Sequence, residues 1–446
     1  MDLLFLFSYI ITVVLIFFVF KIFRYNVFDV NIGNILFLSI FTFGYIGIFP
    51  LFFHLDEYRV EFGIVDKYII SQMYFAVAFS MFVLAFTNIY TYKVLLKKSS
   101  EILSENTRAD TSFLPLFFAF LFSVYSIFSF TSQIESIAFF VLFSDGVGQS
   151  QLARSSMSND SSIFGYYSFV FNYILLFVTL SYQKLSLTTN NKIYSYLFIL
   201  SMLASVFTAI MTTEKAPIIW LFFAIYVNYC LIRNNAKLPS KKILIASTFF
   251  FFLLVLLHIQ FYGYSFDKSV YAVISRAFSG SIQPLYSYIE IFPQQLDFLY
   301  GQSLPNPGGL LPFEPFVLTV EVNNIVNPAD VKRGVVGSMP TIYVGEAYAN
   351  FGIIGVLILP FVISFLILFY EILIRSAKRF YFTSSVYILL ILHIKNLSIT
   401  GYSDYIFDVR AVKFFLFIFS FYLVSKLLYA CTSLKSYRHY GRLKNS

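Results

Sequence analysis

The chain has 446 residues, of which 59% are hydrophobic and 12% are charged, and its mean hydropathy is +0.77. A soluble globular domain has about 45–50% apolar and roughly 25% charged residues, so this composition excludes an ordinary soluble domain and indicates a protein of the lipid bilayer. The formal net charge is +8. The two cysteines and four histidines argue against a disulfide framework and against a zinc or haem enzyme, since no HExxH spacing occurs.

A membrane-spanning helix needs about 20 apolar residues, because it crosses roughly 30 Å of hydrocarbon at 1.5 Å per residue. About eleven runs approach or reach this length, and they predict one all-α, polytopic domain over residues 1–446. In chain order the runs are 2–22, 33–53, 67–92, 113–131, 163–182, 193–211, 216–232, 243–262, 342–373, 381–395 and 410–430. No small-residue cleavage site follows the first run, so we expect it to be retained as a span.

The connectors between these runs differ sharply in charge. One side carries 20 of the 31 Lys and Arg residues, and the other side carries 18 of the 23 acidic residues. By the positive-inside rule the first side is cytoplasmic, which places the C-terminus inside and the N-terminus outside. The net charge therefore reflects topology and attraction to anionic lipids, and we expect no nucleic-acid partner.

The predicted exterior side holds a large loop at 263–341, between spans eight and nine, and a smaller loop at 132–162. The cytoplasmic connectors are short and contain neither a GxxxxGK[ST] nor a GxGxxG motif, so ATP-driven work is excluded there. Long loops in compact proteins are usually functional or disordered, and the Tyr, Phe and Pro content of 263–341 argues against disorder. We therefore expect the functional site in the large loop.

The string GEAYANFGIIG, residues 345–355, stands at the predicted exterior mouth of the ninth span. Its carboxylate, Glu346, is a candidate general base, because a carboxylate shielded from bulk water can accept a proton from an attacking hydroxyl. The alternative is that Glu346 merely interacts favourably with a helix N-terminus. The glycines of the string, Gly345, Gly352 and Gly355, predict a close approach of the backbone to another element or to a ligand.

Cationic side chains on the predicted exterior side form a second group of candidates. These residues are Arg154, Arg276, Arg333, Arg410 and Lys215. Guanidinium groups bind phosphate oxygens bidentately, so we interpret the group as a phosphate clamp, with Arg276 and Arg333 of the large loop as its main members. The alternative is ion pairing with acids of the same side, such as Glu214 next to Lys215.

Three further residues have a less specific pattern. His258 lies one turn before the exterior end of the eighth predicted span, and it is either a substrate-binding residue or a hydrogen-bonded packing residue. Asp404 and Asp408 precede Arg410 in the last exterior segment, where we interpret them as structural partners of that arginine.

The lead-in SRAFSGSIQPLYSYIEIFPQQLDFLYGQSL, followed by GEAYANFG at the next span, resembles the Wzy-type polymerases, which join oligosaccharide repeat units for O-antigen, enterobacterial common antigen or capsule. The resemblance covers residues 276–355 and the overall hydropathy. It implies a multi-pass protein of the bacterial inner membrane, a GT-C-like helical architecture and a periplasmic active site.

The resemblance also implies a reaction. Such an enzyme is a glycosyltransferase that moves the growing glycan from undecaprenyl diphosphate to the non-reducing end of an incoming lipid-linked repeat unit. No cofactor and no metal are implied, and the expected partners are lipid-linked glycans and membrane lipids, with a chain-length regulator protein left open. On this hypothesis Glu346 activates the acceptor hydroxyl. Arg276 and Arg333, assisted by Arg154, hold the diphosphate, and sugars stack on Tyr262, Tyr264, Tyr286 and Tyr288.

Three other functions stay open. An O-antigen ligase would transfer the glycan to lipid A core and would be expected to use a histidine in the large loop, but residues 263–341 contain none. A lipid-linked oligosaccharide flippase, or another transporter, would need charges along a cavity open to both faces, whereas the charges here gather at the predicted exterior ends of the spans. A membrane scaffold would need no converging arginines.

Overall fold

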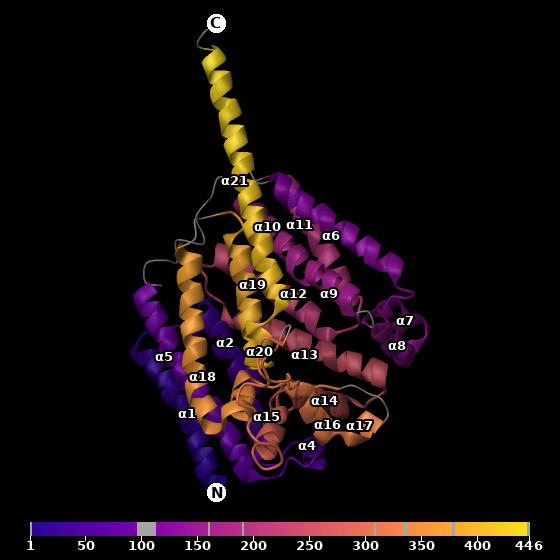
Figure 1. Ribbon diagram of the computed structural model, residues 1–446, viewed down its shortest axis with the longest axis vertical. Coiled ribbons are helices and arrows are strands. Elements are labelled where there is room, and N and C mark those ends of the chain that lie inside the picture. Colours follow the sequence, from indigo (N-terminus) through magenta and orange to yellow (C-terminus); the bar gives the residue numbers. More distant parts are fainter. Residues whose placement is uncertain are drawn as a thin grey trace. The chain divides into compact units, whose positions relative to one another are not determined.

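The chain folds into helices joined by loops in a computed structural model, which describes residues 2–95, 113–158, 161–189, 191–306, 309–332, 337–376 and 380–443. No strand occurs within these ranges (Figure 1). In hydrocarbon every backbone amide must find its partner inside its own segment or in a closed barrel, so helices are the expected structure of the apolar runs. The all-helical prediction is confirmed for the described residues.

Nine segments of the described residues are helices long and apolar enough to cross a membrane. They are Asp2–Ile22, Ile32–Phe52, Lys67–Val94, Phe113–Gln133, Phe164–Thr188, Lys192–Ile210, Lys215–Arg233, Tyr343–Ile374 and Tyr402–Leu428. They indicate a multi-pass membrane protein. The other two predicted runs correspond to α13 (Ser240–Tyr262), whose apolar part is Ser247–Gln260, and to α19 (Thr383–Lys395). Both apolar stretches are shorter than the about 20 residues of a span.

The structure divides into two compact units: residues 1–99, 238–376 and 393–408 form the first, and residues 100–237, 377–392 and 409–446 form the second. The first unit contains α1 (Asp2–Ile22), α2 (Ile32–Ile40), η1 (Phe41–Tyr45), α3 (Ile46–Phe52), α4 (Glu57–Glu61), α5 (Lys67–Leu95), α13, α14 (Phe266–Ala277), α15 (Ser279–Ile291), α16 (Leu318–Val326), α17 (Pro328–Lys332), α18 (Tyr343–Ser376), η5 (Asn396–Ser398) and α20 (Tyr402–Ile406). The second contains α6 (Phe113–Gln133), α7 (Ala138–Ser144), α8 (Gly146–Ser158), α9 (Ser161–Phe169), η3 (Val170–Leu175), α10 (Leu176–Thr188), α11 (Lys192–Ile210), α12 (Lys215–Arg233), most of α19, and α21 (Val409–Leu443).

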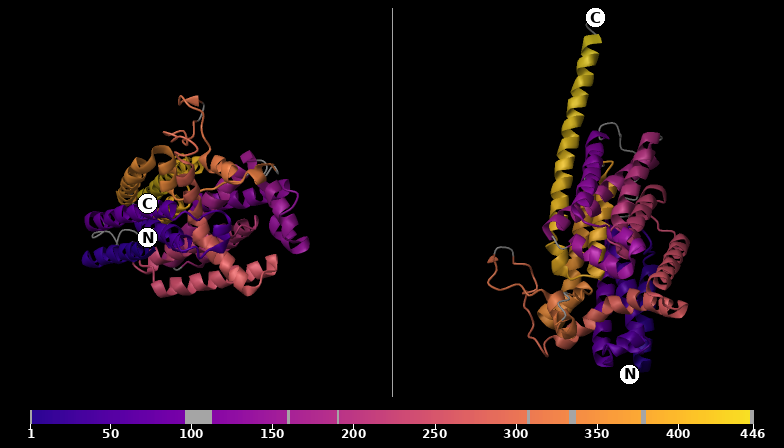
Figure 2. Two further views of the ribbon diagram at one scale, coloured as in Figure 1. Left: turned by 90° about the horizontal axis from the view of Figure 1, so that it is seen from below. Right: turned by 90° about the vertical axis from the view of Figure 1, so that its right-hand side faces the viewer.

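The described part of the large predicted exterior segment, 263–341, contains four helices of its own, α14 to α17. In the first unit α5 packs along α18, and α15 packs against α3, α5 and α18. The connection between α15 and α16 spans residues 292–317. Its described parts, 292–306 and 309–317, run as an extended loop without an α-helix (Figure 2). Helix α15 thus attaches segment 263–341 to the other helices of its unit, and the extended loop that follows α15 can form the wall of a site.

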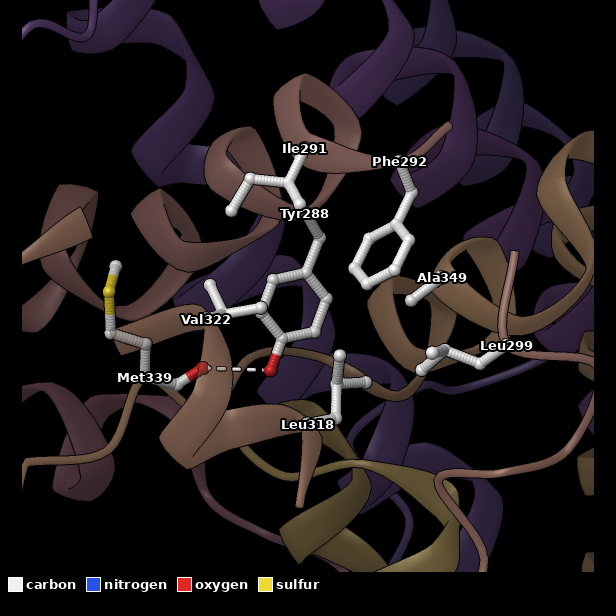
Figure 3. Packing of buried hydrophobic residues seen from close by; sticks show 8 residues of the cluster. All are labelled: Tyr288, Ile291, Phe292, Leu299, Leu318, Val322, Met339 and Ala349. Carbon is white, nitrogen blue, oxygen red and sulfur yellow. Dashed lines mark hydrogen bonds between the residues drawn. The ribbon is translucent and has the colours of Figure 1, made fainter. Parts of the chain in front are cut away.

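A cluster of buried apolar side chains joins this segment to the start of α18 (Figure 3). Its members are Tyr288, Ile291, Phe292, Leu299, Leu318, Val322, Met339 and Ala349. Burial of one large apolar side chain stabilises a fold by roughly 1.5–3 kcal/mol relative to exposure. The cluster therefore fixes α15, α16 and the ends of the extended loop against α18.

Helix α18 is kinked at Gly352, where φ is 58° and ψ is −144°. A Cβ atom at this position would also lie 2.8 Å from the ring of Phe298, so both backbone and space require glycine. The kink interrupts the regular i to i+4 pattern, and the carbonyls of Ala349 and Asn350 accept hydrogen bonds from the amides of Leu299 and Tyr300, at 3.0 and 3.1 Å. Residues 299–301 are thereby attached to the first turns of α18.

The second unit is built around α10, which packs against α11 and α12. The smaller predicted exterior loop, 132–162, contains α7 and α8, which pack on each other. A buried cluster at this end of the unit joins the two short helices to α6 and α9 through Phe130, Ala138, Ala153, Met157 and Tyr167.

Candidate functional site

Glu346 lies in the first turns of α18, before the kink, and its side chain is 3% exposed. Both of its carboxylate oxygens accept hydrogen bonds: Oε1 from the hydroxyl of Ser303, at 2.5 Å, and Oε2 from the backbone amide of Ser403, at 2.9 Å. Three segments far apart in the sequence meet at this carboxylate. Burying a carboxylate without partners is costly, and these two bonds hold it in one position.

Asn350 orders the same region from the next turn of α18. Its Nδ2 donates to Ser303 Oγ and to the carbonyl of Glu346, both at 2.8 Å, and its Oδ1 accepts from the amide of Gly301, also at 2.8 Å. The start of the extended loop is therefore bound to α18 through side chain and backbone. Ser303 reaches Glu346 because of this attachment.

The glycines around Glu346 allow its close packing. A Cβ atom at Gly401 would lie 2.3 Å from Oε2 of Glu346, and one at Gly345 would lie 2.4 Å from Cγ2 of Thr341. A Cβ atom at Gly355 would lie 2.2 Å from the carbonyl oxygen of Ala347. The close approach predicted for the glycines of residues 345–355 is thus observed at Gly345 and Gly355, while Gly352 provides the kink. Gly401 was not predicted.

A cavity of about 400 Å³ opens beside Glu346 within the first unit. Its walls come from α15, the extended loop, α16, α18 and α20. The lining residues are Tyr288, Ser303, Pro305, Asn306, Pro315, Phe316, Val317, Leu318, Thr319, Thr341, Glu346, Gly401, Ser403 and Asp404. Small-molecule sites are typically hollows of about 300–1,000 Å³ with a few placed polar groups, so this cavity has the size and lining of a ligand site.

Tyr288 forms part of the inner wall of the cavity. Its ring is 1% exposed, and its hydroxyl donates to the carbonyl of Met339, at 2.9 Å, as Figure 3 shows. Burial raises the pKa of Tyr288, and the charge of Glu346 raises it further. The residue therefore supports the cavity wall as a neutral phenol.

A second hollow, of about 560 Å³, is also lined by α15 and α18, together with α5. Its lining is almost entirely apolar: Tyr68, Ser71, Gln72, Phe75, Ala76, Leu285, Ile289, Phe298, Tyr348, Phe351, Gly352, Ile353, Ile354 and Val356. The two hollows differ in chemistry although they share two helices. The first presents carboxylates and hydroxyls, and the second presents an apolar surface.

Arg276 stands in the last turn of α14 and is exposed. It does not line the cavity of Glu346, but it lies close enough to Arg59 for the two charges to interact. Burial lowers the pKa of Arg59, Asp56 opposes this effect, and the charge of Arg276 adds to it. The charges of two arginines in the first unit therefore act on each other, and one of the two, Arg59, was not predicted.

Arg59 is held by neutral contacts. Its Nη1 donates to Oε1 of Gln283, its guanidinium lies 4.9 Å from the ring centre of Tyr58, and its buried Nε has no hydrogen-bond partner among the described residues. Gly280 provides the space, since a Cβ atom there would lie 2.6 Å from Nη2. The sequence signal that could have identified Arg59 is its position on the predicted exterior side, in segment 54–66 between the second and third predicted spans.

Three other predicted cations belong to the second unit. Arg154 pairs with Glu214 at the surface, where the two side chains are 48% and 44% exposed. Lys215 begins α12, and Arg410 stands at the start of α21. The ion pair supports the alternative interpretation for Arg154. Arg333 falls outside the described residues.

The remaining predicted residues lie apart from the Glu346 cavity. His258 contacts the carbonyl of Leu254 through Nδ1, at 3.0 Å, one turn earlier in α13. Tyr264 is 45% exposed, and Tyr286 is buried, with its hydroxyl accepting from the amide of Asp66 at 3.2 Å. Tyr262 is the last residue of α13, and its side chain is not among those described. Among the predicted stacking tyrosines whose side chains are described, Tyr288 lines the cavity and Tyr264 and Tyr286 do not.

Helix α20 carries Ser403 and Asp404 to the cavity. Its Tyr405 stacks on His393, with ring centres 4.4 Å apart, and Nδ1 of His393 lies 3.7 Å from Oδ2 of Asp408. Asp404, which the sequence assigned to structure only, lines the cavity. No group of three or more His, Cys, Asp or Glu side chains suited to a metal ion occurs in the part of the chain that the structure describes.

No protein-family model, no curated protein and no solved structure matches this chain.

Proposed function

We propose that this protein polymerises undecaprenyl-diphosphate-linked oligosaccharide repeat units at the outer face of the bacterial inner membrane. The observation that carries the proposal is the buried carboxylate of Glu346, which is held at both oxygens in the wall of a cavity that the large predicted exterior segment helps to build. A base held in one position near a reacting hydroxyl is the main protein group that glycosyl transfer to a lipid-linked acceptor requires.

In the proposed reaction the non-reducing-end hydroxyl of the incoming unit attacks the anomeric carbon of the growing glycan. The new bond joins the acceptor oxygen to this carbon, the bond between the carbon and the diphosphate oxygen breaks, and the hydroxyl proton passes to Glu346. Undecaprenyl diphosphate leaves with the bonding electron pair. No nucleotide or redox partner is needed.

Two other features of the first unit support the proposal. Guanidinium groups stabilise the charge that develops on a diphosphate leaving group, and the charges of Arg59 and Arg276 are close enough to act on each other. The apolar hollow between α5, α15 and α18 suits the isoprenoid chain of a lipid carrier. The apolar hollow shares α15 and α18 with the Glu346 cavity, and Arg59 of α4 donates a hydrogen bond to Gln283 of α15.

Deletion of the gene in its native host, followed by gel analysis of the surface polysaccharide, tests the proposal. A polymerase defect leaves lipid A core capped with single repeat units, so we expect loss of the chain-length ladder. Complementation with Glu346→Gln should fail to restore the ladder. Glu290→Gln should restore it, because Glu290 of α15 receives the same substitution but does not line the cavity. Complete loss of the attached glycan on deletion would instead indicate a ligase or a flippase.

A further inference from the structure

The extended loop that follows α15 has an apolar tip. Residues 302–316 include one charged side chain, Glu314, and five large apolar ones, which are Leu304, Leu310, Leu311, Phe313 and Phe316. In the described part of the loop Leu310 is 83% exposed, and Leu311 beside it is exposed as well. Loops that face water are normally polar. A tip that turns two neighbouring leucines outward therefore indicates contact with an apolar medium.

Hydrogen bonds hold this tip in a defined shape. The base of the loop is closed by the amide of Phe316, which donates to the carbonyl of Gln302 at 2.8 Å. Near the tip, Nδ2 of Asn306 donates to the carbonyls of Leu311 and Phe313, at 2.9 and 2.7 Å. Oδ1 of the same asparagine accepts from the amide of Leu311, at 2.8 Å. The backbone of the tip is thus fixed while its leucines stay exposed.

The loop begins at the level where α18 starts to expose apolar side chains. Residues 343–350 of α18 are buried or half-buried, and the exposed apolar side chains begin at Phe351. Residues 299–300 donate their amides to the carbonyls of residues 349–350, directly before this point. The exposed apolar face of a spanning helix contacts lipid, so the start of the loop lies next to the edge of the hydrocarbon layer.

Two tyrosines lie at the same level. Tyr300, beside the attachment, is 73% exposed, and Tyr68 is exposed in the first turn of α5, which packs along α18. Tyrosine is enriched where a membrane meets water, because its ring is apolar and its hydroxyl is polar. From this level the described parts of the loop stand out crosswise to the direction of α1 and α5 (Figure 2). The tip therefore stays near the surface of the bilayer.

We propose that the tip of the extended loop, Leu310 and Leu311, inserts into the surface of the bilayer beside the start of α18, so that its partner is lipid. Insertion removes both leucines from water, which is favourable, and residues 309–313 contain no charge that would oppose it. By the predicted topology this is the outer leaflet. The same loop forms one wall of the Glu346 cavity, through Phe316 among others, so insertion sets that wall at the membrane surface.

Tryptophan fluorescence of the full chain in phosphatidylcholine vesicles tests the insertion. Trp220 is the single tryptophan of the chain, so Trp220→Phe provides a tryptophan-free background for Leu310→Trp. Interfacial anchors lie about 5–10 Å into the boundary of headgroups and acyl chains. We therefore expect lipid brominated near the headgroup to lower the emission at least about twofold, and lipid brominated near the chain end to lower it less.

The control is Phe361→Trp in the same background. Phe361 is exposed on α18, about 15 Å further along the helix than Phe351 at 1.5 Å per residue, so its level is deep in the bilayer. We expect the reverse order in this variant, with the stronger quenching by lipid brominated near the chain end. The control shows that the vesicles report depth.

Two outcomes overturn the proposal. If brominated lipid does not quench Leu310→Trp but acrylamide in the water does, the tip lies in water. If neither quenches it, a protein surface covers the tip. Leu310→Trp replaces an exposed side chain, so its thermal unfolding should match that of Trp220→Phe; if it does not, Leu311→Trp decides by the same outcomes. The measurement uses no substrate, so its result is independent of the function proposed above.

Discussion

A methyl group at position 401 tests whether the placement of Glu346 matters. Gly401 has φ −65° and ψ 164°, a backbone region open to any residue, so Gly401→Ala introduces no backbone strain. The added Cβ atom would lie 2.3 Å from Oε2 of Glu346, and an ordinary contact requires 3.4 Å or more. The carboxylate must therefore retreat by about 1 Å.

That retreat costs Glu346 its hydrogen bond from the amide of Ser403. The bond measures 2.9 Å, and an additional 1 Å would take it beyond hydrogen-bonding distance. A hydrogen bond to a charged group contributes about 1.5–3 kcal/mol. If the whole amount is lost in the transition state, the rate of polymer formation falls about 10- to 150-fold.

The assay is the initial rate of glycan polymerisation by membranes that contain equal amounts of each variant. The control is Gly148→Ala in α8, where a Cβ atom would meet no other atom within 4 Å. We expect a normal rate in the control and the stated loss in Gly401→Ala. A normal rate in Gly401→Ala, with unchanged thermal unfolding, would refute the reasoning.

Three further predictions concern charges. Arg59→Ala and Arg276→Ala should each lower the rate of polymerisation. The double variant should lower the rate by a smaller factor than the product of the two single factors, because both groups bind one anion. A factor equal to the product, measured in the same membranes, would show that the two arginines act independently. A double-mutant cycle on Arg154 and Glu214, followed by thermal unfolding, should give a coupling below about 1 kcal/mol, since the pair is exposed, and a larger value would contradict this. Burial, and then the charge of Asp66, raise the pKa of Glu290 above the ordinary value of 4.5. Glu290 therefore binds a proton more readily in the folded protein than in the unfolded chain, and the stability of the fold decreases as the pH rises above 4.5. Glu290→Gln should therefore raise the unfolding temperature at neutral pH and lose this advantage on acidification, and no gain at neutral pH would count against the assignment.

The helices of the fold were predictable because membrane helices appear in the sequence as long apolar runs. Long apolar runs became helices, since hydrocarbon leaves the backbone no other partners. The string at 345–355 was also informative, because glycine spacing near a span signals close packing. The kink at Gly352 could not be located, since a positive φ depends on the contact with Phe298 and on the loop at 299–301.

The contacts that build the site were harder to predict because they join distant segments. Ser403 reaches Glu346 across 57 positions and Ser303 across 43. Arg59 and Arg276 come from two separate segments of the first unit, 1–99 and 238–376. Periodicity and local composition contain no information on such pairings. Residue type and predicted sidedness identified Glu346 and Arg276, but the fold was needed to find Arg59 and to place Asp404 in the wall of the Glu346 cavity.

The central claim is that Glu346 accepts the proton of the acceptor hydroxyl during polymer growth. The most direct test uses the purified chain in liposomes, supplied with lipid-linked repeat units extracted from the deletion strain. We expect the parent chain to form polymer and release undecaprenyl diphosphate, and Glu346→Gln, folded to the same unfolding temperature, to lose at least about a hundredfold of the rate. Polymer formation by Glu346→Gln at the parental rate would contradict the account.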